Sequence, residues 1–146
     1  DGVSMQICRH NGLLLAVLTR NEHCPPHVHV GCARWDARFL FSFWHNGVRL
    51  WDVTPAQHEP SSAVLEGLRQ TIKRPEHLLR ARVLWWNSRQ NVCLDNQWWD
   101  IQAEEVITSG ARRTSARAIT AACFDAQRNV TTLTLAGEPH AVEIEL

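Results

Sequence analysis

The 146-residue sequence lacks the features that mark several common protein classes. It has no apolar run long enough to cross a bilayer and no recognisable signal peptide, so we expect a soluble cytoplasmic protein that does not bind membranes. Its five cysteines form no Cys-x-x-Cys pair, which favours free thiols in a reducing compartment. Lys+Arg and Asp+Glu both total 15, so the net charge does not indicate a nucleic-acid or membrane partner.

Two catalytic motifs are also missing. There is no Gly-x-Ser-x-Gly segment, which argues against a Ser-His-Asp hydrolase. With only seven glycines, the chain has no glycine-rich loop that would cradle phosphate. Tyrosine is absent and Lys73 is the only lysine, whereas there are seven tryptophans.

The most informative stretch that is present runs over residues 21–30, Asn-Glu-His-Cys-Pro-Pro-His-Val-His-Val. Proline biases the residue before it towards extended geometry, and the β-branched Val28 and Val30 favour a strand after Pro26. In a strand His27 and His29 share one face, because side chains alternate with a period of two. The sequence therefore predicts a site centred on these two imidazoles.

This site has several possible chemistries. A metal such as zinc would need a third ligand beside His27 and His29, and the candidates are His23, His45, Cys24 and Cys32. Alternatively, His27, His29 or His23 acts as a catalytic acid or base oriented by a carboxylate, for which Glu22, Asp36 and Asp52 are the candidates. A purely structural pair, with ring nitrogens bonded to neighbouring loops, is the third interpretation.

Two known arrangements fit poorly. The cupin type of metal site needs a glutamate a few residues after the second histidine, where this chain has Arg34 and Asp36. The histidine-triad nucleotide hydrolases need a third alternating histidine, and Gly31 occupies that position. We therefore exclude the histidine-triad family.

The hydrophobic pattern predicts an α+β fold. Asn11-Gly12 and Asn46-Gly47 indicate hairpin turns, and about five antiparallel strands are expected by residue 53. Helical spacing begins at Pro60-Ser61-Ser62 and again at Pro75, which predicts two short helices that cover one face of the sheet. A further hairpin is expected over residues 91–102, around Asp95-Asn96.

Three more strands are expected near the C-terminus, as a β-meander. We divide the chain into an α+β domain that contains the histidine motif (1–107), a linker (108–116) and a meander appendage (117–146). A three-stranded meander buries little surface alone, so it should dock on the first domain or on another chain.

Two surfaces are candidates for partner binding. The expected helices carry a locally basic set that would suit nucleic acid, namely Arg69, Lys73, Arg74, Arg80 and Arg82. The Trp85-Trp86 and Trp98-Trp99 pairs are candidates for a protein interface or for stacking on bases. In a strand the two rings of such a pair face opposite ways, so one of Trp98 and Trp99 should be exposed or covered by a partner.

The segments around the histidines resemble a family of small bacterial proteins of unknown function. Asn21-Glu22-His23 and the Pro-Pro-His-Val-His-Val strand of residues 25–30 carry the resemblance, with support from Gly47 and residues 78–86. It covers roughly the first two-thirds of the chain. Residues 118–146 resemble the opening strands of a second uncharacterised family that is often encoded beside the first. The pairing implies a toxin–antitoxin context.

We therefore start from two functional hypotheses. The first is a non-enzymatic interaction module of a prokaryotic toxin–antitoxin, defence or mobile-element system, for which the candidate partners are a protein and RNA or DNA. The second is a metal- or histidine-dependent phosphoesterase or RNase centred on His27 and His29, with a divalent metal such as zinc as its cofactor. The resemblances favour the first hypothesis, and the histidine motif motivates the second.

Overall fold

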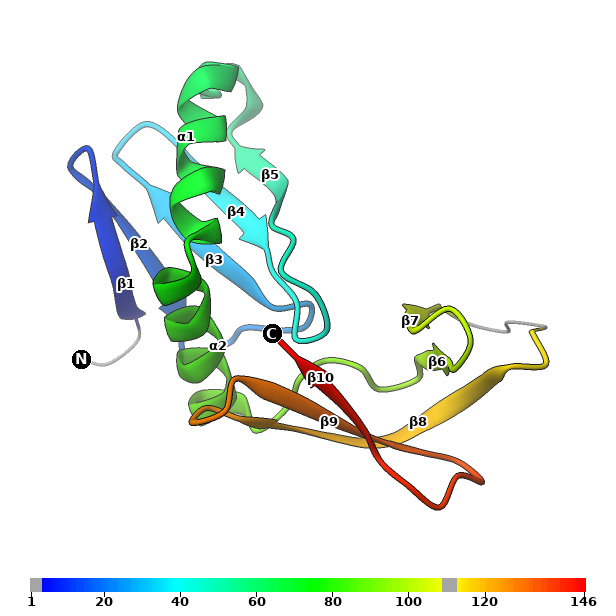
Figure 1. The fold of residues 1–146 in the computed structure, drawn as a ribbon. Helices are drawn as coiled ribbons and strands as arrows, with labels where there is room; N and C mark the ends of the chain where they lie inside the picture. Colours follow the sequence, from blue (N-terminus) through cyan, green and yellow to red (C-terminus); the bar gives the residue numbers. More distant parts are fainter. Residues whose placement is uncertain (1–3, 109–112) are drawn as a thin grey trace.

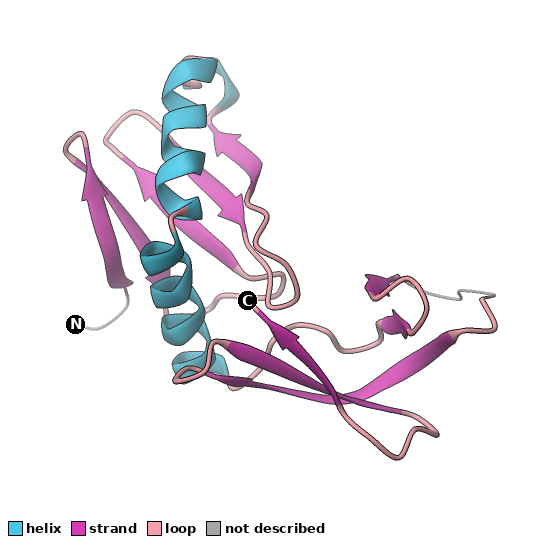
Figure 2. Ribbon diagram, in the orientation of Figure 1, coloured by secondary structure: helices cyan, strands magenta, loops and turns pink. Residues whose placement is uncertain are grey.

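The computed structural model describes residues 4–108 and 113–146 and confirms the α+β class. Over these described residues the chain forms two helices and two antiparallel five-stranded sheets (Figures 1 and 2). The N-terminal sheet and both helices precede residue 90 in the chain. The second sheet lies beyond the C-terminal end of the helical layer (Figure 1).

The N-terminal sheet has its strands in sequence order, as expected for a meander. The strands are β1 (Ser4–His10), β2 (Leu13–Leu18), β3 (His27–Gly31), β4 (Asp36–Leu40) and β5 (Arg49–Thr54). Asn11 and Gly12 both have positive φ (51° and 80°), which confirms the predicted Asn-Gly turn between β1 and β2. In β3, Val28 and Val30 are buried in the core, so His27 and His29 lie on the opposite face.

Helices α1 (Ser62–Lys73) and α2 (Pro75–Arg89) confirm the two predicted helices and follow a short 3-10 turn, η1 (Ala56–His58). Ser61 caps α1 by accepting a hydrogen bond from the Val64 N–H at 3.3 Å, and Pro75 occupies the first turn of α2. The helices run one after the other along one face of the N-terminal sheet (Figure 1). They bury Leu68, Ile72 and Leu78 against that face.

The second sheet has the order β10-β9-β8-β6-β7. Its strands are β6 (Trp98–Asp100), β7 (Glu105–Ile107), β8 (Ala116–Asp125), β9 (Val130–Leu135) and β10 (Val142–Glu145). The meander β8-β9-β10 is present as predicted. However, β6 and β7 belong to the same sheet, so the predicted domain boundary at residue 107 would cut through it.

One continuous core joins the two sheets. Phe43, from the β4–β5 connection, meets Phe124 of β8 edge to face, with ring centroids 5.1 Å apart. Leu133 of β9 is fully buried in the same cluster as Val28 and Trp85. The C-terminal strands therefore dock on the first part of this chain. Residues 109–112 of the predicted linker lie outside the described residues.

Two predicted hairpins are wrong. The β4–β5 connection is an irregular loop over residues 41–48 and not a two-residue turn at Asn46-Gly47. The loop buries Phe41 and Phe43, which provides a physical reason for its length. Residues 92–94 form no strand, and β6 pairs with β7 and β8.

Candidate metal centre and the adjoining cavity

Glu22, His27 and His29 converge on one point over β3, the central strand of the N-terminal sheet. The Nε2 atoms of both imidazoles contact the same oxygen, Glu22 Oε1, and the distance from His29 is 2.9 Å. One ligand-type atom from each of the three residues lies within 4.8 Å of the others. β3 places the two histidines on one face, and the loop before it brings the glutamate over them. Two imidazoles and one carboxylate form a recurrent ligand set for divalent transition metals.

The second nitrogen of each ring faces another oxygen. His27 Nδ1 donates a hydrogen bond to the Pro25 carbonyl at 2.8 Å. His29 Nδ1 lies 3.6 Å from Asp36 Oδ2. Metal-bound histidines in proteins usually have their non-ligating nitrogen held in this way, by a backbone carbonyl or a carboxylate.

Burial differs across the cluster. The His27 side chain is 2% exposed, whereas the side chains of His29 and Glu22 are 18% and 15% exposed. Trp51 and Trp85 cover the His27 ring, with ring centroids at 5.2 and 5.5 Å. The cluster is therefore shielded on the His27 side and open to solvent on the His29 side.

Arg38, on the neighbouring strand β4, lies directly opposite His29. Arg38 of β4 is the register partner of both His29 and Asp52. Its Nε donates to Asp52 Oδ1 at 2.8 Å, and its Nη2 donates to Asp52 Oδ2. The guanidinium lies over the Trp51 ring, 4.0 Å from the centroid. Asp52 and Trp51 therefore fix the orientation of Arg38 beside the cluster.

The carboxylates around the cluster are held in their charged form. Burial raises the pKa of Glu22, but the hydrogen bonds from His29 and His27 outweigh it, so the pKa lies below its usual value. The hydrogen bond from Arg38 lowers the pKa of Asp52. With Asp36, three carboxylates surround one guanidinium, which gives a formal charge of −2 when the imidazoles are neutral.

A disulfide anchors the loop that carries Glu22. Cys24 and Cys93 are bonded, which links this loop to the segment that follows α2, 69 positions away. The expectation of free thiols is therefore wrong for these two residues. Cys8, Cys32 and Cys123 are free. The sequence spacing contains no signal for this pairing, because the two cysteines meet only through the tertiary fold.

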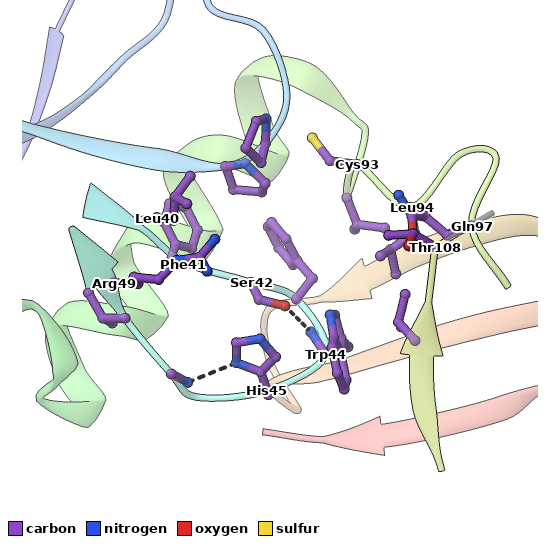
Figure 3. A pocket seen from close by; sticks show the side chains of 17 residues that line it. Leu40, Phe41, Ser42, Trp44, His45, Arg49, Cys93, Leu94, Gln97 and Thr108 are labelled. Carbon is purple, nitrogen blue, oxygen red and sulfur yellow. Dashed lines mark hydrogen bonds between the residues drawn. The ribbon is translucent and has the colours of Figure 1, made fainter. Parts of the chain in front are cut away.

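A cavity of about 510 Å³ adjoins the cluster. Pro25, whose carbonyl holds His27, is part of its wall. In Figure 3, Leu40 and Arg49 lie on one side of the cavity, and Leu94, Gln97 and Thr108 lie on the other. Ser42, Trp44 and His45 come from the loop between β4 and β5. Sequence reasoning missed this cavity, because its walls come from segments far apart in the chain.

The predicted metal ligands separate into two groups. His27 and His29 meet as expected, and Glu22, which the sequence suggested only as an orienting carboxylate, is their common contact. His23 is exposed and lies outside the cluster. His45 is also exposed, and its Nδ1 accepts a hydrogen bond from the Gly47 N–H at 2.9 Å. Neither joins the cluster that the described residues form.

The basic residues predicted to bind nucleic acid differ in exposure: Arg82 is buried and the others are not. Arg82 is 1% exposed and bonds to the loop carbonyls of Ser42 and His45, so its assignment to a nucleic-acid surface is corrected. Arg69 and Arg74 pair with Glu66 and Glu76 at 2.8 and 2.7 Å. Lys73 and Arg80 are exposed.

The tryptophan pairs are mainly core. Trp85 is fully buried and Trp99 is 5% exposed, so neither can form a surface in the folded chain, and their assignment to an interface is corrected. Trp86 and Trp98 are partly exposed. Trp98 and Trp99 therefore face opposite ways, as the period of two predicts.

Comparisons with protein-family models, with curated proteins and with solved structures find no match. The family resemblances and the toxin–antitoxin context therefore stay predictions. Among the described residues, no helix combines the length and apolar character needed to cross a membrane.

Proposed function

We propose that this protein binds one divalent transition-metal ion through Glu22, His27 and His29 and uses it in hydrolytic chemistry. The observation that carries the proposal is the convergence of ligand-type atoms from Glu22, His27 and His29, which lie within 4.8 Å of one another. Because His27 Nδ1 must donate its proton to the Pro25 carbonyl, the neutral ring has only a lone pair at Nε2. A lone pair and a carboxylate oxygen attract each other only with a cation between them, either a proton or a metal ion.

The local charge favours the binding of a cation at the cluster. Glu22, Asp36 and Asp52 outnumber Arg38 by two charges, which a divalent ion would balance. Three protein ligands would leave coordination positions for water on the solvent-exposed side of His29. A metal at such a site lowers the pKa of bound water and supplies a nucleophile for hydrolysis.

Phosphoesters, including RNA, are the substrate class that we propose for this centre. Arg38 supports this choice because Asp52 occupies only its Nε and one Nη2 donor, which leaves the other edge of the guanidinium for a ligand. Trp51 and Asp52 hold the guanidinium, and Arg38 is the cross-strand neighbour of His29. We expect Arg38 to position the substrate, while a metal held by Glu22, His27 and His29 would supply activated water for hydrolysis.

Calorimetric titration with Zn²⁺ tests the metal site. We expect 1:1 binding by the wild type and at least about 100-fold weaker binding by His29→Ala and Glu22→Gln, since even outer partners of metal ligands matter by about 10- to 100-fold. His23→Ala is the matched control, because His23 lies in the same loop but outside the cluster. Circular dichroism checks the fold of each variant. A wild type that binds no Zn²⁺, Co²⁺ or Mn²⁺ refutes the proposal.

The interaction module predicted from the sequence is a second candidate function. It is favoured by Trp51, which is 39% exposed on β5, an edge strand of its sheet. A partner protein would cover this ring and the unpaired strand edge. The wild type purified from its host should then carry a partner protein or RNA that Trp51→Ser loses. A wild-type monomer free of both contradicts this candidate.

The sequence predicts a cytoplasmic location, whereas disulfides persist mainly in oxidising compartments. The metal-centre proposal is compatible with either location, since its ligands do not include a cysteine.

A further inference from the structure

The wall of the cavity beside the cluster carries basic side chains but, among the described residues, no acidic ones. The described residues that line it include no aspartate and no glutamate. Arg49 and His45 are its ionisable side chains apart from Cys93, which is in the disulfide. The whole sequence has equal numbers of acidic and basic residues, whereas the described lining of this cavity has no negatively charged side chain.

A buried cation lies behind the wall of this cavity. Arg82 of α2 is 1% exposed and donates to the carbonyls of Ser42 and His45 at 2.8 and 2.9 Å, and to Asn46 Oδ1 at 2.8 Å. No carboxylate of the described residues forms an ion pair with it. Burial lowers the pKa of Arg82 to about 10. A buried charge without a counter-ion is costly, and an anion in the adjoining cavity would offset part of that cost.

Two hydrogen-bond donors line the cavity directly. His45 Nδ1 accepts the Gly47 N–H, so the neutral ring carries its proton on Nε2, where it can be donated to a ligand. Arg49 is exposed and forms no ion pair with any carboxylate in the described parts of the chain. Figure 3 shows both side chains on the β4–β5 side of the cavity. They provide a place for a carboxylate or a similar anionic group.

Most of the rest of the wall is apolar, apart from Ser42, Gln97 and Thr108. Phe41, Phe43, Val48, Leu94 and Val106 contribute hydrocarbon surface, and Trp44 adds an aromatic ring. A volume of about 510 Å³ lies within the usual range for small-molecule sites. The cavity therefore combines an apolar body with a positively charged end.

We propose that this cavity binds a small organic anion with an apolar body, held by Arg49 and His45 and favoured by the buried charge of Arg82. The site is separate from the metal cluster and does not depend on it. Its specificity comes from the absence of acidic groups in its wall and from the two donors at one end.

Calorimetry with 2-naphthoate and with the uncharged, similarly shaped 2-naphthamide tests the proposal. EDTA is present throughout, so that no metal at Glu22, His27 and His29 can bind the carboxylate. We expect 2-naphthoate to bind at least 10-fold more tightly than the amide. Arg49→Gln should reduce this preference by at least 10-fold, because it removes the positive charge and leaves the described hydrogen bonds intact.

Arg9→Gln is the matched control, since Arg9 is exposed on β1 and lies outside the cavity wall. Equal affinity for the acid and the amide, binding of neither compound, or an unchanged preference in Arg49→Gln would each overturn the proposal. Arg82→Met should also weaken 2-naphthoate binding where it folds. Arg49→Gln decides the question if Arg82→Met does not fold, because Arg49 is exposed and supports no other described side chain.

Discussion

At the scale of single residues, His27 is the most constrained side chain of the candidate centre. Its Nδ1 is committed to the Pro25 carbonyl, its Nε2 faces Glu22, and two tryptophan rings cover it. A residue in this position cannot rotate to find other partners. The chemistry available to the site therefore depends on whether Nε2 and the glutamate share a proton or a metal ion.

Asp100 provides a test of electrostatics away from this centre. It is 3% exposed and accepts hydrogen bonds from the Ala103 N–H, Arg113 and Ser115, which lower its pKa to about 2. A carboxyl whose pKa is lowered on folding stabilises the protein above its unfolded pKa, and this stabilisation is lost as the pH falls towards the folded pKa. We expect the melting temperature of the wild type to fall more steeply than that of Asp100→Asn between about pH 4 and pH 2.

Thermal melts followed by circular dichroism across this pH range measure the difference between the two proteins. Asp95→Asn is the control, because Asp95 is exposed and forms no ion pair among the described residues. Parallel pH profiles for Asp100→Asn and the wild type would contradict the stabilising role of the Asp100 carboxylate.

The sequence predicts two of the three proposed ligands, His27 and His29. It suggests the third, Glu22, only as a carboxylate that orients a histidine. Strand periodicity alone places His27 and His29 on one face. Glu22 lies in a loop, where no periodicity fixes the direction of a side chain, so its convergence with the histidines becomes visible only in the folded chain. His23 and His45 share the residue type of the ligands, but the fold directs them elsewhere.

At the scale of elements, the loop before β3 depends on a distant contact. The Cys24–Cys93 bond fixes this loop between Glu22 and His27, two of the proposed ligands. We expect the Cys24→Ser/Cys93→Ser double variant to lose about 4 kcal/mol of unfolding free energy, given the 69-position separation. We also expect weaker Zn²⁺ binding, since the glutamate is then held less firmly. Denaturant titration and calorimetry measure the two effects.

Cys32→Ser is the control for the disulfide, since Cys32 is a free, exposed cysteine. It should behave as the wild type in both measurements. Unchanged Zn²⁺ affinity in the double variant would show that the Glu22 loop keeps its position without the disulfide.

The helices and the first hairpin were predictable because their signals are local. Ser61 and Pro75 begin the helices as their residue types suggest, and Asn11-Gly12 forms its turn. The Asn46-Gly47 signal is misleading, because the preceding loop buries Phe41 and Phe43 and is held by Arg82. Tertiary packing decides this connection against the local turn preference.

At the scale of the whole molecule, the two sheets share one core. The sequence predicts the C-terminal meander but not its extension by β6 and β7, because the pairing of β6 with β8 joins segments on both sides of residues 101–115. The Phe43–Phe124 contact then ties this sheet to the loop beside the cavity. The protein should therefore unfold as a single unit.

Replacing Phe124 tests this coupling. Phe124 is 5% exposed, and Phe124→Ala should cost about 3–5 kcal/mol of unfolding free energy. We expect one cooperative transition, with amide hydrogen exchange accelerated in both sheets. The control is Cys123→Ser, which changes the neighbouring exposed side chain of β8. Accelerated exchange confined to residues 98–146 would mean that the second sheet unfolds independently.

The central claim is that Glu22, His27 and His29 form a metal centre in which both imidazoles bind through Nε2. Proton NMR of the Co²⁺-loaded protein tests it most directly, because a paramagnetic ion strongly shifts the signals of its ligands. The account predicts 1:1 Co²⁺ uptake and two strongly shifted, exchangeable imidazole signals, which come from the Nδ1 protons of His27 and His29. One of them should disappear in His29→Ala, and both should persist in His23→Ala. Absence of stoichiometric Co²⁺ uptake, or persistence of both shifted signals in His29→Ala, would contradict the account.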